Sequence, residues 1–223
     1  MKKALVALAS LLALALTAGA ALAEYSPTLK FSLSTTKALA NPEVNIVVEQ
    51  EADEEELGHV TLTLPAGFNL PDDEAIADGD VLGTADLTIA AGPACRNDGA
   101  SAIPLAPAVT IPARQIVEQD RTDEQADRGV HAVWVVDLQP VTAIPLEVTG
   151  SVAKGWKLDG DIPANDNTCP PLVFDGTIQS ESDGGVPLIT NPAKPGKYVL
   201  GGALYSAESP TVTKFKQAVK ITK

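Results

Sequence analysis

The sequence predicts an all-β protein, folded as an antiparallel β-sandwich. Short runs of alternating apolar and polar residues are separated by Gly- and Pro-rich turns, which is the period of strands with one buried face. There are about ten such runs and no convincing long helix. The chain also contains 17 Gly and 17 Pro but only 4% aromatic residues. This pattern favours an immunoglobulin-like or jelly-roll-like arrangement, and the lack of an internal repeat argues against a solenoid or a propeller.

The first 23 residues have the three parts of a secretory signal peptide. Two lysines follow Met1, a largely apolar run covers residues 4–16, and Ala-Leu-Ala precedes Glu24. We therefore expect cleavage after Ala23 and a mature chain, residues 24–223, that forms one β-sandwich domain without a membrane span. The alternatives are a retained membrane anchor and two small sandwiches.

The charge of the chain limits its partners. The full sequence has 16 Lys+Arg against 29 Asp+Glu, and removal of the leader would leave 14 against 29, a formal charge of −15. Such a charge repels nucleic acid and anionic lipid, so we expect neither as a partner. We expect secretion, or release into the periplasm if the host has an outer membrane, and an extracellular protein or a cell-surface glycan as partner. The sequence leaves the oligomeric state open.

The clearest strand is the stretch that ends at Phe68. Three apolar residues alternate with polar ones up to Leu64, and Thr61 belongs to the set that should face solvent. Pro65 then ends the strand, and Gly67 allows a turn that folds Phe68 over the end of the core.

Two strands are predicted before this one, over residues 28–34 and 43–49. The acidic run 49–56 connects the second of them to the strand that ends at Leu64. The pattern therefore predicts three successive antiparallel strands that lie side by side.

Downstream, alternation predicts strands over residues 81–90 and 129–138, with Trp134 as a core anchor of the second. In this second strand, Val133 and Val135 belong to the face opposite Trp134. Residues 100–128 are less regular, and their charged part, from 118 onward, is predicted to be a surface connector or one short helix.

Four further strands are predicted toward the carboxyl end, over residues 144–153, 172–178, 197–205 and 211–221. Gly201-Gly202 suggests a bulge or a close backbone approach. Lysines at alternate positions in the last strand are typical of a guarded sheet edge.

The chain has two cysteines, Cys95 and Cys169. In an exported protein such a pair predicts a disulfide. It would close a loop of roughly 70 residues and stabilise the fold by up to about 4 kcal/mol. A pair of reactive thiols is the alternative, although neither cysteine lies in a C-x-x-C motif.

Two histidines, His59 and His131, fall on the predicted polar faces of strong strands. They could share a metal ion if those strands pair, but a zinc site needs three or four ligands and neither histidine has another at ligand spacing. No G-x-S-x-G motif occurs, and a Ser-His-Asp triad cannot be placed. Acidic pairs suited to glycoside hydrolysis are present but cannot be assigned from the sequence. We therefore expect no catalytic residues and no cofactor.

Three acidic clusters are candidates for Ca²⁺, which prefers several carboxylate oxygens. They lie at residues 51–56, at residues 72–80, and around Asp159, Asp161 and Asp166. None has the spacing of an EF-hand loop, so solvated loops are the simpler interpretation. Asp159, Asp161 and Asp166 remain the candidate metal ligands.

Three short motifs resemble those of secreted bacterial surface proteins with immunoglobulin-like sandwich domains and no assigned activity. They are Leu-Pro-Ala-Gly-Phe at 64–68, Leu-Gly-Thr-Ala at 82–85 and Leu-Ile-Thr-Asn-Pro at 188–192. The chain departs from that group in showing no wall-anchoring motif and no repeated domain. The resemblance implies a fold and does not carry a function.

Two functions follow from these observations. The first is a secreted, non-catalytic β-sandwich that acts as a structural or interaction module. The second is an exported hydrolase or a calcium-dependent binding module that uses acidic loops at one end of the sandwich. They differ in whether Asp and Glu side chains from separate loops converge in one place.

Overall fold

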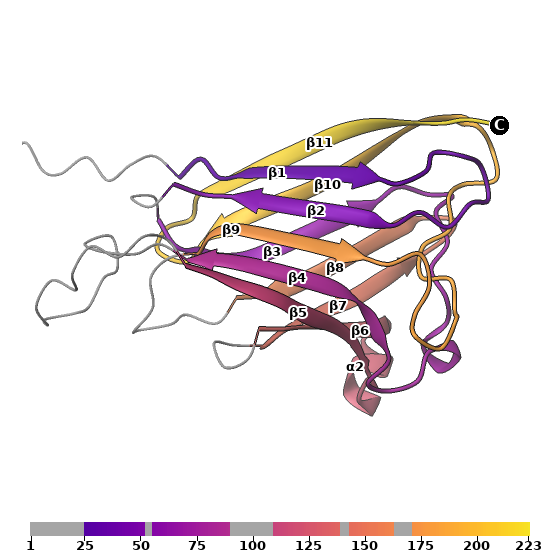
Figure 1. Ribbon diagram of the computed structural model, residues 1–223, viewed down its shortest axis with the longest axis horizontal. Helices are drawn as coiled ribbons and strands as arrows, with labels where there is room; N and C mark the ends of the chain where they lie inside the picture. Colours follow the sequence, from indigo (N-terminus) through magenta and orange to yellow (C-terminus); the bar gives the residue numbers. More distant parts are fainter. Residues whose placement is uncertain (1–24, 52–54, 90–108, 139–142, 163–170) are drawn as a thin grey trace, which may run out of the picture.

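Eleven strands form one antiparallel sheet, in the order β1-β2-β9-β4-β5-β6-β7-β8-β3-β10-β11 (Figure 1). The computed structural model describes residues 25–51, 55–89, 109–138, 143–162 and 171–223. The strands are β1 (Thr28–Leu33), β2 (Val44–Glu49), β3 (Leu57–Leu64), β4 (Val81–Ile89), β5 (Val109–Gln119), β6 (Val130–Asp137), β7 (Ala143–Ser151), β8 (Gly155–Asp161), β9 (Pro171–Ile178), β10 (Gly196–Ser206) and β11 (Val212–Ile221). A 3-10 helix, η1 (Asp73–Ala75), and a short α-helix, α2 (Asp123–Asp127), complete the described elements.

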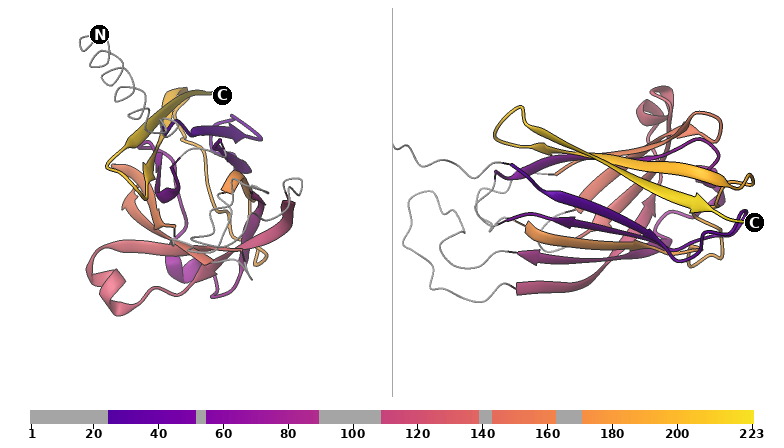
Figure 2. Two further views of the ribbon diagram at one scale, coloured as in Figure 1. Left: turned by 90° about the vertical axis from the view of Figure 1, so that its left-hand side faces the viewer. Right: turned by 90° about the horizontal axis from the view of Figure 1, so that it is seen from above.

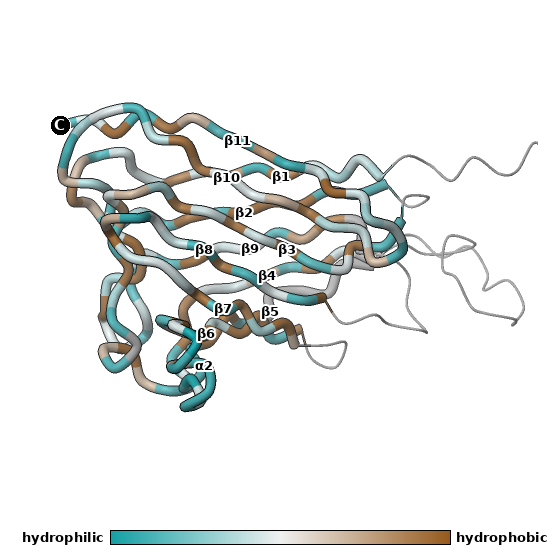
Figure 3. The backbone as a smooth tube through the Cα atoms, turned by 180° about the vertical axis from the view of Figure 1, so that it is seen from behind, coloured by the Kyte–Doolittle hydropathy of each residue, from teal (hydrophilic) through white to brown (hydrophobic). Residues whose placement is uncertain are grey.

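The sheet curves until it is nearly closed, so that its two halves pack face to face. Strands β1, β2, β9, β4 and β5 form one half, and β7, β8, β3, β10 and β11 form the other (Figures 1 and 2). Alternating apolar residues point between the halves and form one continuous buried cluster. Figure 3 shows the mixture of apolar and polar residues along the strands. The prediction of an all-β, antiparallel fold is confirmed, and the two packed faces belong to one continuous ladder of hydrogen bonds.

Most predicted strands are confirmed within one or two residues. In β1 and β2 the residues assigned to the interior, such as Phe31 and Ile46, are buried. Trp134 in β6 is only 1% exposed, as expected of a core anchor. Side chains of this kind each contribute about 1.5–3 kcal/mol when fully buried.

The corner after β3 closes one end of the interior. Gly67 has a φ of 100°, which lets the chain reverse, and Phe68 is completely buried. The indole Nε1 of Trp156 donates to the carbonyl oxygen of Phe68 at 2.9 Å, and the ring of Tyr198 packs edge-on against Phe68 at a centroid distance of 5.9 Å. The predicted turn is therefore confirmed, and its carbonyl is bonded within the core.

Strand order differs from the prediction in one important respect. Strand β3 does not pair with β2; it lies between β8 and β10. Strand β2 pairs instead with β1 and β9. Strands β2 and β3, which follow each other in sequence, therefore lie in opposite halves of the sheet. Their closeness in sequence predicted that they would pair.

Two strands were missed. Residues 109–119 form β5 despite Pro112, and residues 155–161 form β8, where a loop with a candidate calcium site was expected. In β8 the buried residues Trp156 and Leu158 alternate with polar residues that face outward. The short helix between residues 118 and 128 is confirmed as α2, which begins with a capping box made by Thr122 and Gln125.

Three residues on the outer face lie where the alternation predicts but are buried there. Val133 and Val135 of β6 are 2% and 9% exposed, because they pack with Val117 and other apolar residues in a second cluster on the outer side of the sheet. Thr61 is 7% exposed, because it lies beneath polar neighbours on β8. Outward orientation in a sheet is therefore not the same as exposure.

The first and last strands of the order, β1 and β11, meet along a seam. Antiparallel pairing of an odd number of strands makes β1 and β11 run in the same direction, and a parallel bridge joins Lys37 to Thr222 just beyond them. The side-chain amide of Gln217 accepts from the backbone N–H of Phe31 at 3.0 Å and donates to its carbonyl oxygen. One glutamine thus satisfies a donor and an acceptor that would otherwise lie at an open edge.

Close packing near the seam also depends on Gly202 of β10. A Cβ atom at this position would collide with the side chain of Leu29 on β1. The predicted close approach at Gly201-Gly202 is therefore confirmed. The glycine lets the two halves of the sheet come together beside the seam.

We predict that Gln217→Met destabilises the fold by about 1–3 kcal/mol, because the apolar side chain leaves the N–H and the carbonyl of Phe31 without their partner. Thermal unfolding should show a melting temperature lower by roughly 2–4 °C per kcal/mol. Lys216→Met is the matched control, since it places the same residue at an exposed position of the same strand. Equal melting temperatures for the two variants would contradict the role of Gln217.

Candidate functional site

The densest polar cluster of the described residues lies on the outer face of β3 and β8. It consists of His59 and Thr61 from β3 and of Lys157, Asp159 and Asp161 from β8. Antiparallel pairing sets His59 opposite Asp161 and Thr61 opposite Asp159. Because alternate residues of a strand share a face, all five side chains meet on the outside of the sheet.

Asp159 is the centre of this cluster. Its Oδ1 accepts from the Thr61 hydroxyl at 2.6 Å and lies 2.8 Å from Lys157 Nζ. The same oxygen is 3.1 Å from His59 Nε2, and the other ring nitrogen, Nδ1, is 2.7 Å from Asp161 Oδ1. His59 therefore lies between two carboxylates that belong to one strand.

The network continues onto both neighbouring strands. The ring of Tyr205, on β10, packs edge-on against His59 at a centroid distance of 5.0 Å. On the other side, Glu147 of β7 is the cross-strand neighbour of Asp159. Glu147 Oε1 is 2.7 Å from Arg128 Nη2 and accepts from Gln125 Nε2 at 3.1 Å, so that helix α2 and the residue after it are tied to the sheet.

These contacts change the acidity of the carboxylates. Partial burial opposes ionisation of Asp159, but the hydrogen bonds from Lys157 and Thr61 and the charge of Lys157 outweigh it, so the pKa of Asp159 is lowered. The hydrogen bond from Arg128 lowers the pKa of Glu147 despite partial burial. Both side chains are held in the charged form that their partners require.

Asp161, His59 and Thr61 have the distances of a hydrolase triad, since Thr61 Oγ1 is 3.3 Å from His59 Nε2. The hydroxyl nevertheless donates to Asp159, which makes the shorter contact. In addition, β3 is paired on both sides, so the backbone N–H groups around Thr61 are engaged in the ladder and do not form an oxyanion hole. The arrangement is that of a structural hydrogen-bond network.

The proposed shared metal site of His59 and His131 is wrong. Strand β3 and strand β6 are separated in the sheet by β7 and β8, which corresponds to roughly 14 Å. His131 has other partners: its Nε2 lies 2.7 Å from the carbonyl oxygen of Pro71, and its ring packs on Trp156. Within the described parts of the chain, no group of three or more His, Cys, Asp or Glu side chains could hold a metal ion.

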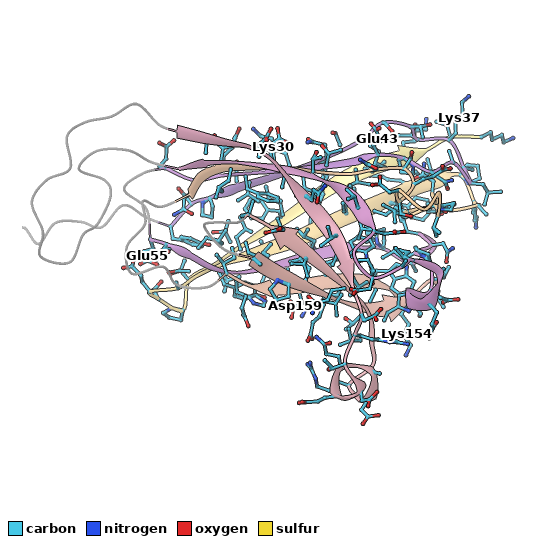
Figure 4. All side chains as sticks on the ribbon, turned by 60° about the horizontal axis from the view of Figure 1, so that its bottom comes forward. Lys30, Lys37, Glu43, Glu55, Lys154 and Asp159 are labelled. Carbon is cyan, nitrogen blue, oxygen red and sulfur yellow. The ribbon has the colours of Figure 1, made fainter. Side chains whose placement is uncertain are left out.

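In their described parts, the acidic clusters at residues 51–56 and 72–80 do not converge. Glu55 precedes β3 and residues 72–80 follow it, so the eight residues of β3 separate these clusters by roughly 26 Å. Figure 4 shows Glu55 at one end of the sheet and Lys154 at the other, with Asp159 on the face between them. Asp159 and Asp161 lie on β8, whereas Asp166 lies outside the described residues.

The carboxylates in these clusters have local partners. Ser209 donates to Glu55 at 2.5 Å, and hydrogen bonds from Ser206 and Ser209 lower the pKa of Glu55. In the second cluster, Glu74 Oε1 is 3.2 Å from Arg121 Nη2, and Asp78 accepts from the backbone N–H of Asp120 at 3.2 Å. Apart from Ser206 at the end of β10, these residues lie outside the strands, so the contacts join one connecting segment to another.

The sequence around Asp159 has the alternation of a strand with one polar face, which predicts that its polar side chains lie together. Lys157, Asp159 and Asp161 alternate with Trp156, Leu158 and Gly160, which is a strand period. Gly155 and Gly160 weakened that pattern. Pairing with β3 could not have been inferred, since about 100 residues separate the two strands.

Comparison with known proteins does not assign the chain to a family. No known family model and no curated protein matches the chain. No helix among the described residues is long and apolar enough to cross a membrane. Cys95 and Cys169 lie outside the described residues, so the disulfide remains a prediction.

We predict that Asp159→Asn destabilises the fold at pH 7 and that the loss becomes smaller as the pH falls. The lowered pKa of Asp159 means that its stabilising effect is complete above the unfolded pKa of about 4 and is lost as the pH falls through the folded pKa. Urea unfolding of wild type and variant between pH 7 and pH 3 would measure the difference. Asp183→Asn, at an exposed position, is the control, and a pH-independent difference for Asp159→Asn would contradict the prediction.

Proposed function

We propose that the chain is an exported, non-catalytic module that acts in structure or interaction outside the cytoplasm. The observation that carries this proposal is the packing of the interior. Apolar side chains from both halves of the sheet form one buried cluster, while the densest polar cluster satisfies its own hydrogen-bonding groups. Recognition would therefore use the outer face and the loops.

The amino-terminal sequence supports export. Residues 1–23 combine a basic start, an apolar run and small residues before Glu24, and the chain has an even pair of cysteines suited to an oxidising compartment. The resemblance of short motifs to secreted surface proteins agrees with this location. An extracellular protein or a cell-surface glycan is the corresponding class of partner.

The arrangement of the acidic residues favours this function over a calcium-dependent module or a hydrolase. A calcium site takes six to eight oxygen ligands, and an inverting or retaining glycosidase needs two carboxylates at a defined separation across a substrate. The clusters before and after β3 lie at opposite ends of the sheet. Asp159 and Asp161 are engaged by His59, Thr61 and Lys157.

Export is tested by expressing the full chain in a bacterial host and sequencing the amino terminus of the released protein. We expect the sequence to start at Glu24, because signal peptidase cleaves after small residues. A variant with Ala21→Asp and Ala23→Asp should be processed poorly. Intact Met1 on cytoplasmic material would overturn the proposed location.

Independence of calcium is tested by thermal unfolding in millimolar calcium. We expect a negligible shift in melting temperature, because the described carboxylates offer no shared site. A site with micromolar affinity would add about 4 kcal/mol at 1 mM calcium. A saturable shift that is absent in the double variant Asp159→Asn, Asp161→Asn would favour the calcium-dependent binding module instead.

A further inference from the structure

A row of exposed lysines covers the outer face of the last hairpin. Lys197 lies on β10, and Lys214, Lys216 and Lys220 lie on β11. The residues between them on β11, such as Phe215 and Val219, pack against the core, so the lysines point outward. We refer to Lys197, Lys214, Lys216 and Lys220 as the lysine strip.

This strip reverses the charge of the molecule locally. The full chain has a net charge of −13, but residues 194–223 contain six lysines and a single acidic residue, Glu208. Glu208 lies in the turn between β10 and β11 and is not on the outer face of either strand. Positive charge is therefore concentrated on one hairpin of an acidic protein.

The lysines of the strip are not engaged in ion pairs with any residue that the structure describes. Elsewhere on the sheet, cations and anions are matched, as in Lys30 with Glu49 at 2.8 Å and Lys157 with Asp159 at 2.8 Å. Arg128 is likewise held by Glu147. The positive charge of the strip is thus available to a partner.

The lysines of the strip lie along one face of the hairpin, with Ala218 and Val199 between its two ends. Lys197 and Lys220 are direct cross-strand neighbours, with Cβ atoms about 5 Å apart. Lys214 and Lys216 are about 7 Å apart along β11, and the row extends roughly 20 Å from Lys214 to Lys220. The positions beside the row are small: Gly201 and Ala203 on β10 are paired with Lys216 and Lys214, and Ala218 separates Lys216 from Lys220.

Edge protection does not explain the whole strip. Outward lysines on a terminal strand such as β11 discourage pairing with other sheets. Lys197, however, belongs to β10 and not to the terminal strand, although the pairing of β10 with β3 begins only at Gly201. Gln217 already joins β11 to β1. A lysine directly opposite another lysine costs stability, so the Lys197–Lys220 pair requires another reason.

We propose that the lysine strip binds a linear anionic polysaccharide, with carboxylate or phosphate groups along its chain. This inference rests on the proposed export of the protein, which would expose the strip to such polymers. An extended polymer can lie along the row over the small residues, and each charged unit meets a lysine. The exposed hydroxyl of Thr63, beside Gly201, adds a hydrogen-bonding group for a sugar.

Other polyanions fit the strip less well. Single-stranded nucleic acid is bound by aromatic platforms as well as positive charge, and the nearest outward aromatic residue, Tyr205, packs against His59. Lipid surfaces are bound by large apolar side chains that insert between headgroups, whereas Val199 and Val212 are the largest exposed apolar residues on the hairpin. At physiological ionic strength, charges beyond about 8 Å are screened, so the acidic remainder does not cancel the strip.

Binding is tested with purified mature chain in 150 mM NaCl, with polygalacturonate as the carboxylate polysaccharide, a phosphomannan as the phosphate polysaccharide and dextran as the neutral polysaccharide. We expect titration calorimetry to show binding of at least one anionic probe and none of dextran. The probe that binds identifies the anionic group. Lys214→Gln with Lys216→Gln should weaken that binding at least tenfold, and Lys197→Gln with Lys220→Gln should do the same.

The control is Lys154→Gln, in the turn between β7 and β8, which removes one positive charge outside the strip and should alter the affinity less than twofold. The matched single change Lys216→Gln, within the strip, should weaken binding more. The Lys214 and Lys216 variants and the control should unfold at the wild-type temperature, since these lysines are exposed. The Lys197→Gln, Lys220→Gln variant should unfold at that temperature or slightly above it, because it removes two like charges from opposite positions. Failure to bind either probe, or equal losses in strip and control variants, would overturn the inference. Tighter binding to a DNA duplex or to anionic vesicles, or self-association lost in the strip variants, would also overturn it.

These outcomes are independent of export. A chain that begins at Glu24 outside the cell but binds neither probe would overturn only the inference about the strip. A chain that binds in solution but keeps Met1 inside the cell would overturn the proposed function and leave the charge recognition intact.

Discussion

Satisfaction of the backbone at the seam between β1 and β11 is the constraint on which this fold depends. A sheet with two open edges exposes rows of N–H and carbonyl groups, which must find partners or remain in water. Here the first and last strands run in the same direction, and the side chain of Gln217 supplies both a donor and an acceptor to Phe31. Curvature brings these edges together, and the same curvature places the two apolar faces in contact.

Packing near the seam shows how closely the two halves are matched. Leu29 of β1 occupies the space beside Gly202 of β10, where any larger residue would collide with it. At one end of the interior, Phe68 and Trp156 are joined by a hydrogen bond from the indole to a backbone carbonyl. Backbone groups that enter the core are thereby paired, which removes a desolvation cost of about 1–3 kcal/mol for each.

The outer face combines two kinds of charged surface. Around Asp159, side chains from β3, β7 and β8 and from the residue after α2 form hydrogen bonds and ion pairs across the sheet. On the hairpin of β10 and β11, lysines remain without such partners in the described structure. The first arrangement stabilises the sheet through charge-assisted hydrogen bonds. The second leaves positively charged side chains that can attract an anionic partner.

The sequence by itself determined the strand class, most strand positions and the buried face of each clear strand. Local alternation, as in β1 and β2, and the Pro-Gly corner before Phe68 depend on neighbours in sequence, so they could be predicted. Strand β8 was missed because glycines and aspartates interrupt its pattern, although the alternation of Trp156 and Leu158 with polar residues is present.

Only the tertiary structure decided which strands are neighbours, and with them the site. His59 meets Asp159 and Asp161 because β3 pairs with β8, whereas β3 and β2, adjacent in sequence, lie in opposite halves of the sheet. Thr61 is buried for the same reason. Strand alternation specifies the face on which a side chain lies, but long-range pairing specifies its neighbours, and that pairing arises from the packing of the whole core rather than from any local run of residues.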